Sequence, residues 1–343
     1  MPTTQKMRTT EDKTIIQDFT PALALEKRTF TLLEDLGLWD EANTEYLYTD
    51  SLEVEREIEN ISEMFANARG GERNYMVPQD AETAFFKVPF FTLDGRVDPK
   101  DRFKLRKFGT VEQSVEVENL VAKKVSGVQR SHANLHRMAQ YVALVDNKVH
   151  AIGKDGKEIK SIAKDFSSVW GTNRLTHTMD LQSDKDPLAE LETVRQQIIK
   201  NAGDNGDDYR LVVLLSSADF QAIVHHPTVE AAYSAYSSAE EPLRNRLSGN
   251  KNNQMFTHQG VTLISDISGK IKAGKAHLMP LDFDGMFTRL YSPADTLDQD
   301  GEIAKEAYMW TEESRRVYRL ESEVAVAYII KRPELICDIT VSK

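Results

Sequence analysis

The chain of 343 residues is poor in cysteine, and its single Cys337 excludes an intrachain disulfide framework. A long hydrophobic run is also missing, since no apolar stretch approaches the roughly 20 residues that a membrane-spanning helix requires. The first 18 residues are polar and mixed in charge, without the apolar segment of a secretory signal. These absences predict a protein of cytoplasmic origin that does not cross a membrane.

Positive charge is also in deficit, because 43 Lys and Arg face 54 Asp and Glu, for a net charge of -11. Such a surface excludes tight wrapping of DNA around the whole protein, although an acidic protein that merely faces packaged DNA would not hinder its packing. One short segment is nevertheless rich in basic residues. It could contact nucleic acid or an acidic partner, or it could be a solvated face that pairs with acidic neighbours; its residues are Lys100, Arg102, Lys104, Arg106 and Lys107.

No complete catalytic motif is present. Residues 269–276 match the phosphate-loop pattern, but Ala276 replaces the magnesium-binding hydroxyl and the residues that follow are strand-like, so we predict a basic hairpin turn. His132 and His136 lie four residues apart on a predicted helix. Without a third ligand nearby, they are expected to face solvent.

Three other candidates are incomplete in the same way. The pair His225-His226 ends a predicted helix, where histidine interacts favourably with the helix dipole. The run 282–285 begins like a calcium loop but lacks the closing Glu, and Cys337 has no Cys-His-Asn context. We therefore expect no catalytic residue, no metal ion and no cofactor.

The first 92 residues have apolar positions but no evident core of their own. Residues 1–45 carry apolar clusters too broken for one helix, which predicts an extended arm. Residues 46–92 predict two strand-like stretches, 46–49 and 85–91, around a polar tip, and the spacing between them suits a short helix or a bulged strand. Such an excursion is marginal alone, so we expect it to lie on a neighbouring copy. The candidate intersubunit contacts are Phe30, Leu33, Trp39, Tyr46, Arg69, Gly70, Arg73, Phe85 and Phe86.

The rest of the chain alternates helical and strand patterns. Apolar steps of three and four predict one long helix over 113–145, about 45 Å long at 1.5 Å per residue. A hairpin over 146–166 is predicted around the Gly153–Gly156 turn, and residues 167–186 show no clear periodicity. The C-terminal half predicts a helix over 187–201 capped by Asp186, a buried strand at 211–215, a helix capped by Ser217, and strands at 261–266, 275–280, 317–320 and 324–330.

Several segments carry a resemblance when taken in order. They are the Arg69-Gly70-Gly71 tip, the run from Val88-Pro89 to Val97-Asp98-Pro99, the long helix with its hairpin, Phe256–Val261, Phe287–Asp295, and Arg332-Pro333 before the last strand. Together they resemble the phage lambda-type major capsid protein E family over about residues 30–340. The resemblance implies the Hong Kong 97-like capsid fold of tailed phages.

In that fold the chain would be α+β and divided into five regions. The regions are an N-terminal arm (1–45), an extended loop (46–92), a peripheral domain (93–186) with a spine helix (113–145) and hairpin (146–166), an axial domain (187–300), and C-terminal strands that return to the peripheral domain (301–343).

The resemblance also implies a function. The chain would be the major capsid protein of a tailed double-stranded-DNA phage, self-assembling into the hexamers and pentamers of an icosahedral head in the virion. Its partners would be further copies of itself, a separate scaffolding protein, a portal and a decoration protein, with packaged DNA nearby and assembly in the host cytoplasm. An encapsulin-like compartment shell is the alternative, and a soluble hydrolase or nucleotide-binding enzyme is a third hypothesis.

Overall fold

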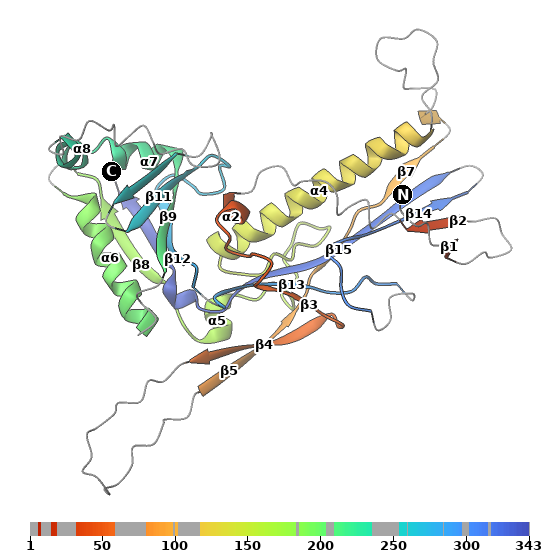
Figure 1. Cartoon of the computed structure of the whole chain (residues 1–343), viewed down its shortest axis with the longest axis horizontal. Coiled ribbons are helices and arrows are strands. Elements are labelled where there is room, and N and C mark those ends of the chain that lie inside the picture. The colour runs from red at the N-terminus through yellow and green to blue at the C-terminus, as the bar shows by residue number, and fades with distance from the viewer. Residues whose placement is uncertain are drawn as a thin grey trace, which may run out of the picture.

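Two β-sheets lie end to end along the molecule, and a two-stranded hairpin projects from its side (Figure 1). The computed structural model describes the backbone alone of residues 6–7, 15–18, 57–58, 80, 117–119 and 232–234. It describes backbone and side chains of residues 32–56, 81–98, 100–101, 120–182, 185–203, 209–231, 254–258, 260–283, 285–296, 302–314 and 317–342. Helices and strands both contribute, so the predicted α+β class is confirmed. No helix in these ranges is long and apolar enough to cross a membrane.

The larger sheet is organised around one long strand, β15 (Tyr318–Ile330). It pairs with four other strands, which are β14 (Tyr308–Glu313), β13 (Phe287–Tyr291), β6 (Phe90–Thr92) and β7 (Gly95–Val97). The order among the described residues is β1 (Lys6–Met7), β2 (Ile15–Asp18), β14, β15, β13 and β3 (Thr44–Tyr46). The separate strands predicted at 317–320 and 324–330 are thus a single element.

The long helix α4 (Val117–Val145) packs along β15. Most of the predicted span 113–145 is confirmed, and its first four residues lie outside the described ranges. The helix continues without a break through Gly127. Ala139, Ala143 and Leu144 lie in the main hydrophobic core together with the second half of β15, so the apolar stripe buries itself against the sheet.

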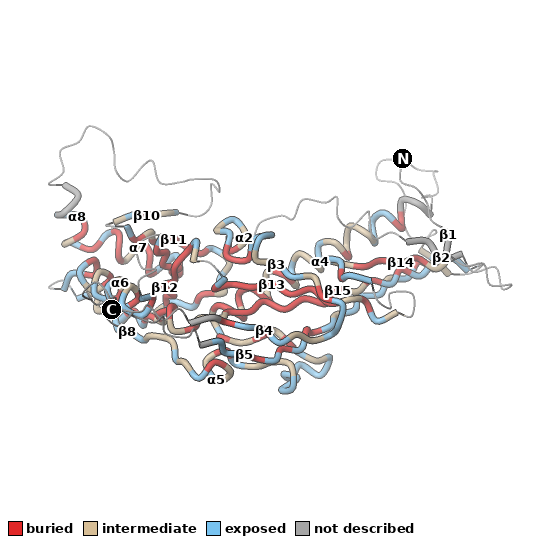
Figure 2. The backbone as a smooth tube through the Cα atoms, turned by 60° about the horizontal axis from the view of Figure 1, so that its bottom comes forward, coloured by how far each residue is buried: buried red, intermediate tan, exposed pale blue. Residues whose placement is uncertain are grey.

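The second sheet has the order β10 (Met255–His258), β11 (Val261–Asp266), β9 (Arg210–Ser216), β12 (Lys275–Leu281), β16 (Cys337–Ser342) and β8 (Leu175–Asp180). Strand β9 is buried on both faces, which explains its continuous apolar run. Leu211, Val213 and Leu215 face a core shared with helices α6 (Pro187–Ala202) and α7 (Ser217–Val224), while Val212 and Leu214 face the main core. In Figure 2 buried stretches lie near α7, β11 and β12, whereas α6 and β8 mix buried, intermediate and exposed residues.

Side-chain caps mark the residues at which these helices begin. The Asp186 side chain accepts a hydrogen bond from Leu188 N at 3.1 Å, as the sequence predicted for the start of α6. Helix α7 is capped one residue earlier than predicted, because Ser216 Oγ and not Ser217 accepts the Asp219 amide at 3.2 Å. Helix α8 (Pro227–Ser234) follows directly.

Chain order and sheet membership do not coincide. Strand β16 closes the chain in the second sheet, so only β14 and β15 of the predicted C-terminal region 301–343 join the larger sheet. Strand β8 also joins the second sheet, although it falls within the predicted region 93–186, and β13 joins the larger sheet from within 187–300. These corrections arise because strand pairing depends on partners distant in sequence.

The region 146–186 also differs from expectation. The predicted hairpin retains only two isolated bridges, Lys148 with Asp165 and Ile152 with Glu158, and is otherwise held by turns. The stretch without periodicity contains α5 (Phe166–Trp170) as well as β8. Asp165 caps α5 by accepting the Ser168 amide at 2.8 Å, and the Trp170 indole donates to the carbonyl of Ile330 at 3.1 Å.

The end of the predicted arm is built into the chain's own core. Helix α2 (Leu32–Asp35) packs into the main core, β3 joins the larger sheet beside β13, and the Trp39 indole donates to Ile329 O at 3.3 Å. The Trp39 ring meets Phe287 and Tyr328 edge-on at 5.2 and 5.3 Å. The interpretation that the first 92 residues have no core of their own is therefore wrong for residues 32–47, where Leu32, Leu33, Leu38, Trp39 and Leu47 are buried within one chain.

The projecting hairpin consists of β4 (Ser51–Ile58) and β5 (Asp80–Lys87). Its first strand is thus a regular strand at 51–58, not at 46–49, and the tip between the strands lies outside the described residues. Arg56 anchors it to the body: Nε donates to Glu82 at 2.7 Å, and Nη1 and Nη2 donate to the carbonyls of Lys331 and Trp170 at 3.1 Å each. The guanidinium also lies 4.9 Å above the Trp170 ring.

A buried polar cluster joins α4 to the second sheet. Arg174 donates to the carbonyl of Leu144 at 2.6 Å, at the C-terminal end of α4, and to Asp338 of β16 at 3.2 Å. Asp338 also bonds His277 Nδ1 of β12 at 2.7 Å. Burial raises the pKa of Asp338, but the hydrogen bond from His277 and the charge of Arg174 lower it by more, to below its ordinary 3.8.

Removing the hairpin anchor should destabilise the fold. The change Arg56→Ala is expected to lower the free energy of unfolding by about 2 kcal/mol, because one buried and one partly buried carbonyl lose their donor. Urea unfolding of the unassembled chain measures this. Arg96→Ala, at an exposed ion pair with Asp98, is the matched control and should change little. Equal effects of the two changes would contradict the anchoring role.

The polar cluster should set part of the acid response. A carboxyl whose pKa is lowered on folding stabilises the fold above its unfolded pKa of about 4, and this stabilisation is lost as pH falls through the lower folded value. Asp338→Asn should therefore reduce stability at pH 7 and flatten the loss below pH about 4. Unfolding measured against pH tests this, with Asp98→Asn as control. An unchanged acid limb in Asp338→Asn would contradict it.

Candidate assembly interface

The projecting hairpin has two chemically different faces, because strand side chains alternate. On the inner face, Val54 and Phe86 are 2% and 1% exposed, and Phe86 packs against α5. On the outer face, Glu53 and Glu55 are exposed, and Phe85 opposite Glu53 is 50% exposed. The hairpin is thus fixed to its own chain on one side and presents carboxylates with an aromatic ring on the other.

The candidate contact residues divide accordingly. Leu33, Trp39 and Phe86 are at most 2% exposed within one chain, so they have almost no surface to offer a neighbour, and the expectation for them is corrected: they are core residues. Tyr46 is partly exposed and stacks on Tyr291 at 5.4 Å between ring centroids. Phe85 keeps a large exposed surface. The other four candidates, Phe30, Arg69, Gly70 and Arg73, lie outside the described residues.

A groove of about 640 Å³ lies at the base of the projecting hairpin. Its walls include Tyr48 and Phe90, which are 65% and 40% exposed, together with Val88 and Pro293. Exposed aromatic rings gathered along one groove are typical of a surface that another protein covers. Both aromatic stretches, 46–49 and 85–91, are evident in the sequence, but the exposure of their rings is not. Only strand pairing decides which side chains of a short strand face outward.

The phosphate-loop match lies in the connection from β11 to β12, as a turn ahead of a strand, but the predicted hairpin is wrong because β9 lies between these two strands in the sheet. Gly269 and Gly274 both have positive φ, at 71° and 81°, and Lys275 opens β12 where a phosphate loop would start a helix. The Gly274 amide donates to the Asp219 carboxylate at 2.7 Å. The backbone donor that would face a phosphate is therefore occupied by an anion of the protein itself.

The histidine pair on α4 faces the sheet, which corrects the expectation of solvent-facing side chains. His136 is 2% exposed, and its Nδ1 is joined by a 2.7 Å hydrogen bond to the Tyr328 hydroxyl. His132 Nε2 is joined to Ser322 Oγ at 2.6 Å. Both rings serve as polar contacts between α4 and β15, since buried polar groups on a helix need partners.

The other candidates also have structural roles. His225 ends α7 and pairs with Glu230, while His226 Nε2 lies 3.0 Å from the Gln182 carbonyl. Burial raises the pKa of Cys337 to about 12, so this side chain stays a protonated thiol at neutral pH. Among the described residues, no group of three or more His, Cys, Asp or Glu is placed to hold a metal ion.

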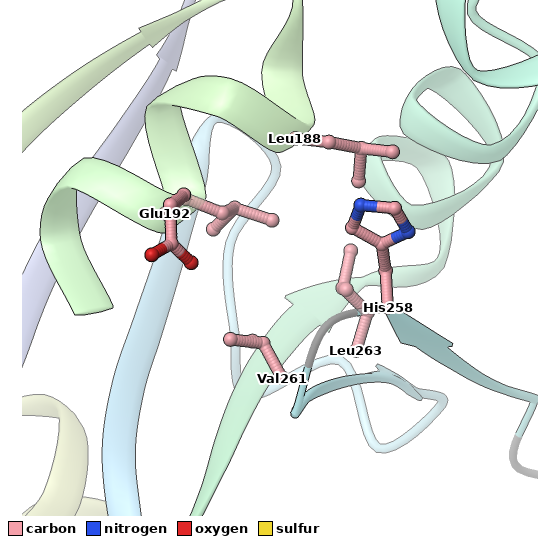
Figure 3. Close-up of a pocket in the computed structure, with 6 residues that line it drawn as sticks. Leu188, Glu192, His258, Val261 and Leu263 are labelled. Carbon is pink, nitrogen blue, oxygen red and sulfur yellow. The ribbon is translucent and has the colours of Figure 1, made fainter. Parts of the chain in front are cut away.

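A small pocket under α6 has no room for a substrate. It lies where α6 crosses β10 and β11, and its volume of about 10 Å³ suits at most one water molecule (Figure 3). Glu192 at its edge is paired with Arg195 at 2.7 Å, and the hydrogen bond from Arg195 is the main cause that lowers the pKa of Glu192. The pocket is a packing gap between the helix and the sheet.

Known proteins with the same architecture are phage capsid proteins. A major capsid protein of Pseudomonas phage KPP10 is 21% identical over 337 residues, covering 93% of this chain and 94% of that protein. The fold matches a capsid chain of cyanophage P-SCSP1u with a TM-score of 0.55 at 8% identity, covering 93% of this chain and 90% of the other. The capsids of Ralstonia phage GP4 and Myoviridae phage XM1 match with TM-scores of 0.52 each, at 11% and 10% identity, over 93% of this chain and 93% and 95% of theirs.

These likenesses identify the arrangement as the Hong Kong 97-like capsid fold. The family model described as phage major capsid protein E matches residues 17–341, nearly the entire chain. This family consists of structural capsid proteins and not of enzymes, which agrees with the structural roles of the histidines, Cys337 and the glycine turn. The chain therefore belongs to the phage major capsid protein E family.

Proposed function

We propose that this chain forms hexamers and pentamers that close into the icosahedral head of a tailed double-stranded-DNA phage. As a member of its family it is a major capsid protein of a tailed phage, and self-assembly into a shell follows from that membership. The observation that carries the proposal is the family match over 17–341, which leaves little of the chain outside the shell-forming unit. Closed symmetry then requires each copy to offer surfaces to its neighbours.

The surfaces around the projecting hairpin support this proposal. The outer face of the hairpin and the aromatic groove at its base leave exposed apolar groups that a monomer in water would better bury. We place contacts between copies there, with Phe85 as the candidate that keeps its exposed surface.

Further partners are proposed from the family resemblance, and the net charge bears on one of them. A net charge of -11 suits a shell whose inner surface should not bind packaged DNA tightly. Initiation of a closed shell by a scaffolding protein and a portal, assembly in the host cytoplasm and a decoration protein on the outside belong to the same proposal. An encapsulin-like compartment would use the same closed symmetry, and it would contain a cargo enzyme in place of a genome.

Particle formation tests the proposal directly. Expression of the chain with the scaffolding protein of the same phage should give spherical particles of uniform size, visible by negative-stain electron microscopy. The scaffolding protein expressed alone is the control. Small soluble species under all salt and scaffold conditions would count decisively against a shell subunit.

The exposed aromatic ring of the hairpin gives a second test. Phe85→Ser should leave the unfolding free energy nearly unchanged but lower the yield of particles, because the ring is half exposed in the single chain. The neighbouring change Phe86→Ser is the matched control and should cost about 3 kcal/mol or more in stability. Sedimentation measures assembly and urea unfolding measures stability. Unchanged particle yield in Phe85→Ser would remove this residue from the interface.

A further inference from the structure

A second cleft, of about 480 Å³, lies between the C-terminal half of α4 and the turn that joins β11 to β12. Its apolar wall comes from α4, with Met138, Val142 and Val145. Its opposite rim carries Lys270, Lys272 and Lys275, the lysines of the glycine turn. The other lining residues are Tyr141, Asp146, His277 and Asp338.

This cleft, called the lysine cleft below, is lined by some charged groups that form ion pairs and by others that do not. Neither Lys270 nor Lys272 forms an ion pair with another described residue, whereas Asp338 is already paired with Arg174 and His277. His277, whose side chain is 6% exposed, has a buried Nε2 without a hydrogen-bond partner in the described part of the chain. The cleft therefore combines an apolar wall with spare cationic groups in a protein that is acidic overall.

The outer face of the projecting hairpin has the complementary chemistry. Glu53 and Glu55 lie two residues apart on β4, so their exposed carboxylates share one face. Phe85 stands opposite Glu53 in the ladder and adds a half-exposed ring. Neither carboxylate is paired within the described residues. Two carboxylates beside an aromatic ring fit a rim of lysines beside an apolar wall.

The two surfaces also lie on opposite sides of the molecule. The hairpin projects from one side of the β15 sheet, and α4, which forms a wall of the lysine cleft, lies along the other side in both views (Figures 1 and 2). A head-to-tail interface joins two different patches of the same chain, and it closes into a ring when the rotation between copies allows. Two separate patches that face different neighbours are compatible with such a ring.

We propose that the outer face of the hairpin in one copy docks into the lysine cleft of the next copy. Glu53 and Glu55 pair with Lys270 and Lys272, and Phe85 packs on the apolar wall formed by α4. The inference rests on the proposed function, which supplies the ring of copies, and adds the pair of surfaces that meet. It accounts for the lysines that this acidic chain concentrates on the turn between β11 and β12.

Charge reversal on each side tests the pairing. The cleft variant Lys270→Glu/Lys272→Glu and the hairpin variant Glu53→Lys/Glu55→Lys should each reduce particle yield about tenfold, because like charges then face each other. The chain that carries all four changes should recover most of the yield. Co-expression of the cleft variant with the hairpin variant should recover six-membered rings with alternating chains, since each can pair with the other but not with itself, whereas a five-membered ring keeps one mismatched contact.

Lys154→Glu/Lys157→Glu is the matched control, with two exposed lysines changed on another turn. It changes the net charge by the same amount as the cleft variant does and should assemble normally. Thermal unfolding of each unassembled chain checks that folding is intact. If the cleft variant assembles as the wild type does, or the four-change chain does not recover, the inference is overturned.

Two further outcomes separate this inference from its alternatives. If the cleft variant loses binding of a short DNA duplex while particle yield is unchanged, the cleft serves nucleic acid and the pairing is wrong. If the wild-type chain itself gives no particles with its scaffolding protein, the proposed function fails, and the inference fails with it. If the wild type forms particles and the charge-reversed variants assemble equally well, this inference is overturned while the proposed function stands.

Discussion

The structure depends on the pairing and burial of strand β15. Its second half is buried on both faces, and its backbone bonds β14, β13, β6 and β7 along its length. The indoles of Trp39 and Trp170 donate to the consecutive carbonyls of Ile329 and Ile330 at its end. Segments from the start, middle and end of the chain are thus fixed to one strand, and loss of its register would move every side chain to the wrong face.

This arrangement explains how a projecting hairpin is held without a core of its own. The inner face of the hairpin is apolar at Val54 and Phe86, and Arg56 satisfies two carbonyls of the body through a guanidinium that is itself almost fully buried. Anchoring by one face leaves the other face available. An acidic outer face that is held rigidly loses less conformational entropy on binding a neighbour than a flexible loop would.

Polar side chains form the junction between the two sheets, whereas the cores on either side of it are apolar. Arg174 joins the end of α4 to Asp338, and Tyr141 donates to Asp266 at 2.8 Å, so α4 is tied to the second sheet by directed hydrogen bonds. Directed bonds with buried partners specify one relative placement more narrowly than apolar contact does. The same junction borders the lysine cleft, so the geometry of that cleft follows from the placement of α4.

The sequence by itself determined the elements whose signals are local. The stripe of α4, the Asp186 cap of α6 and the two-sided apolar run of β9 are contained within a few neighbouring residues, and the order of elements was enough to indicate the family. The tertiary structure alone decided the continuity of β15, the placement of β8 and β16 in the second sheet and the inward orientation of His132 and His136. It also decided that Trp39 is a core residue, because its partner Ile329 lies 290 residues away. Such contacts depend on loop closure over most of the chain, and no local pattern of residues encodes them.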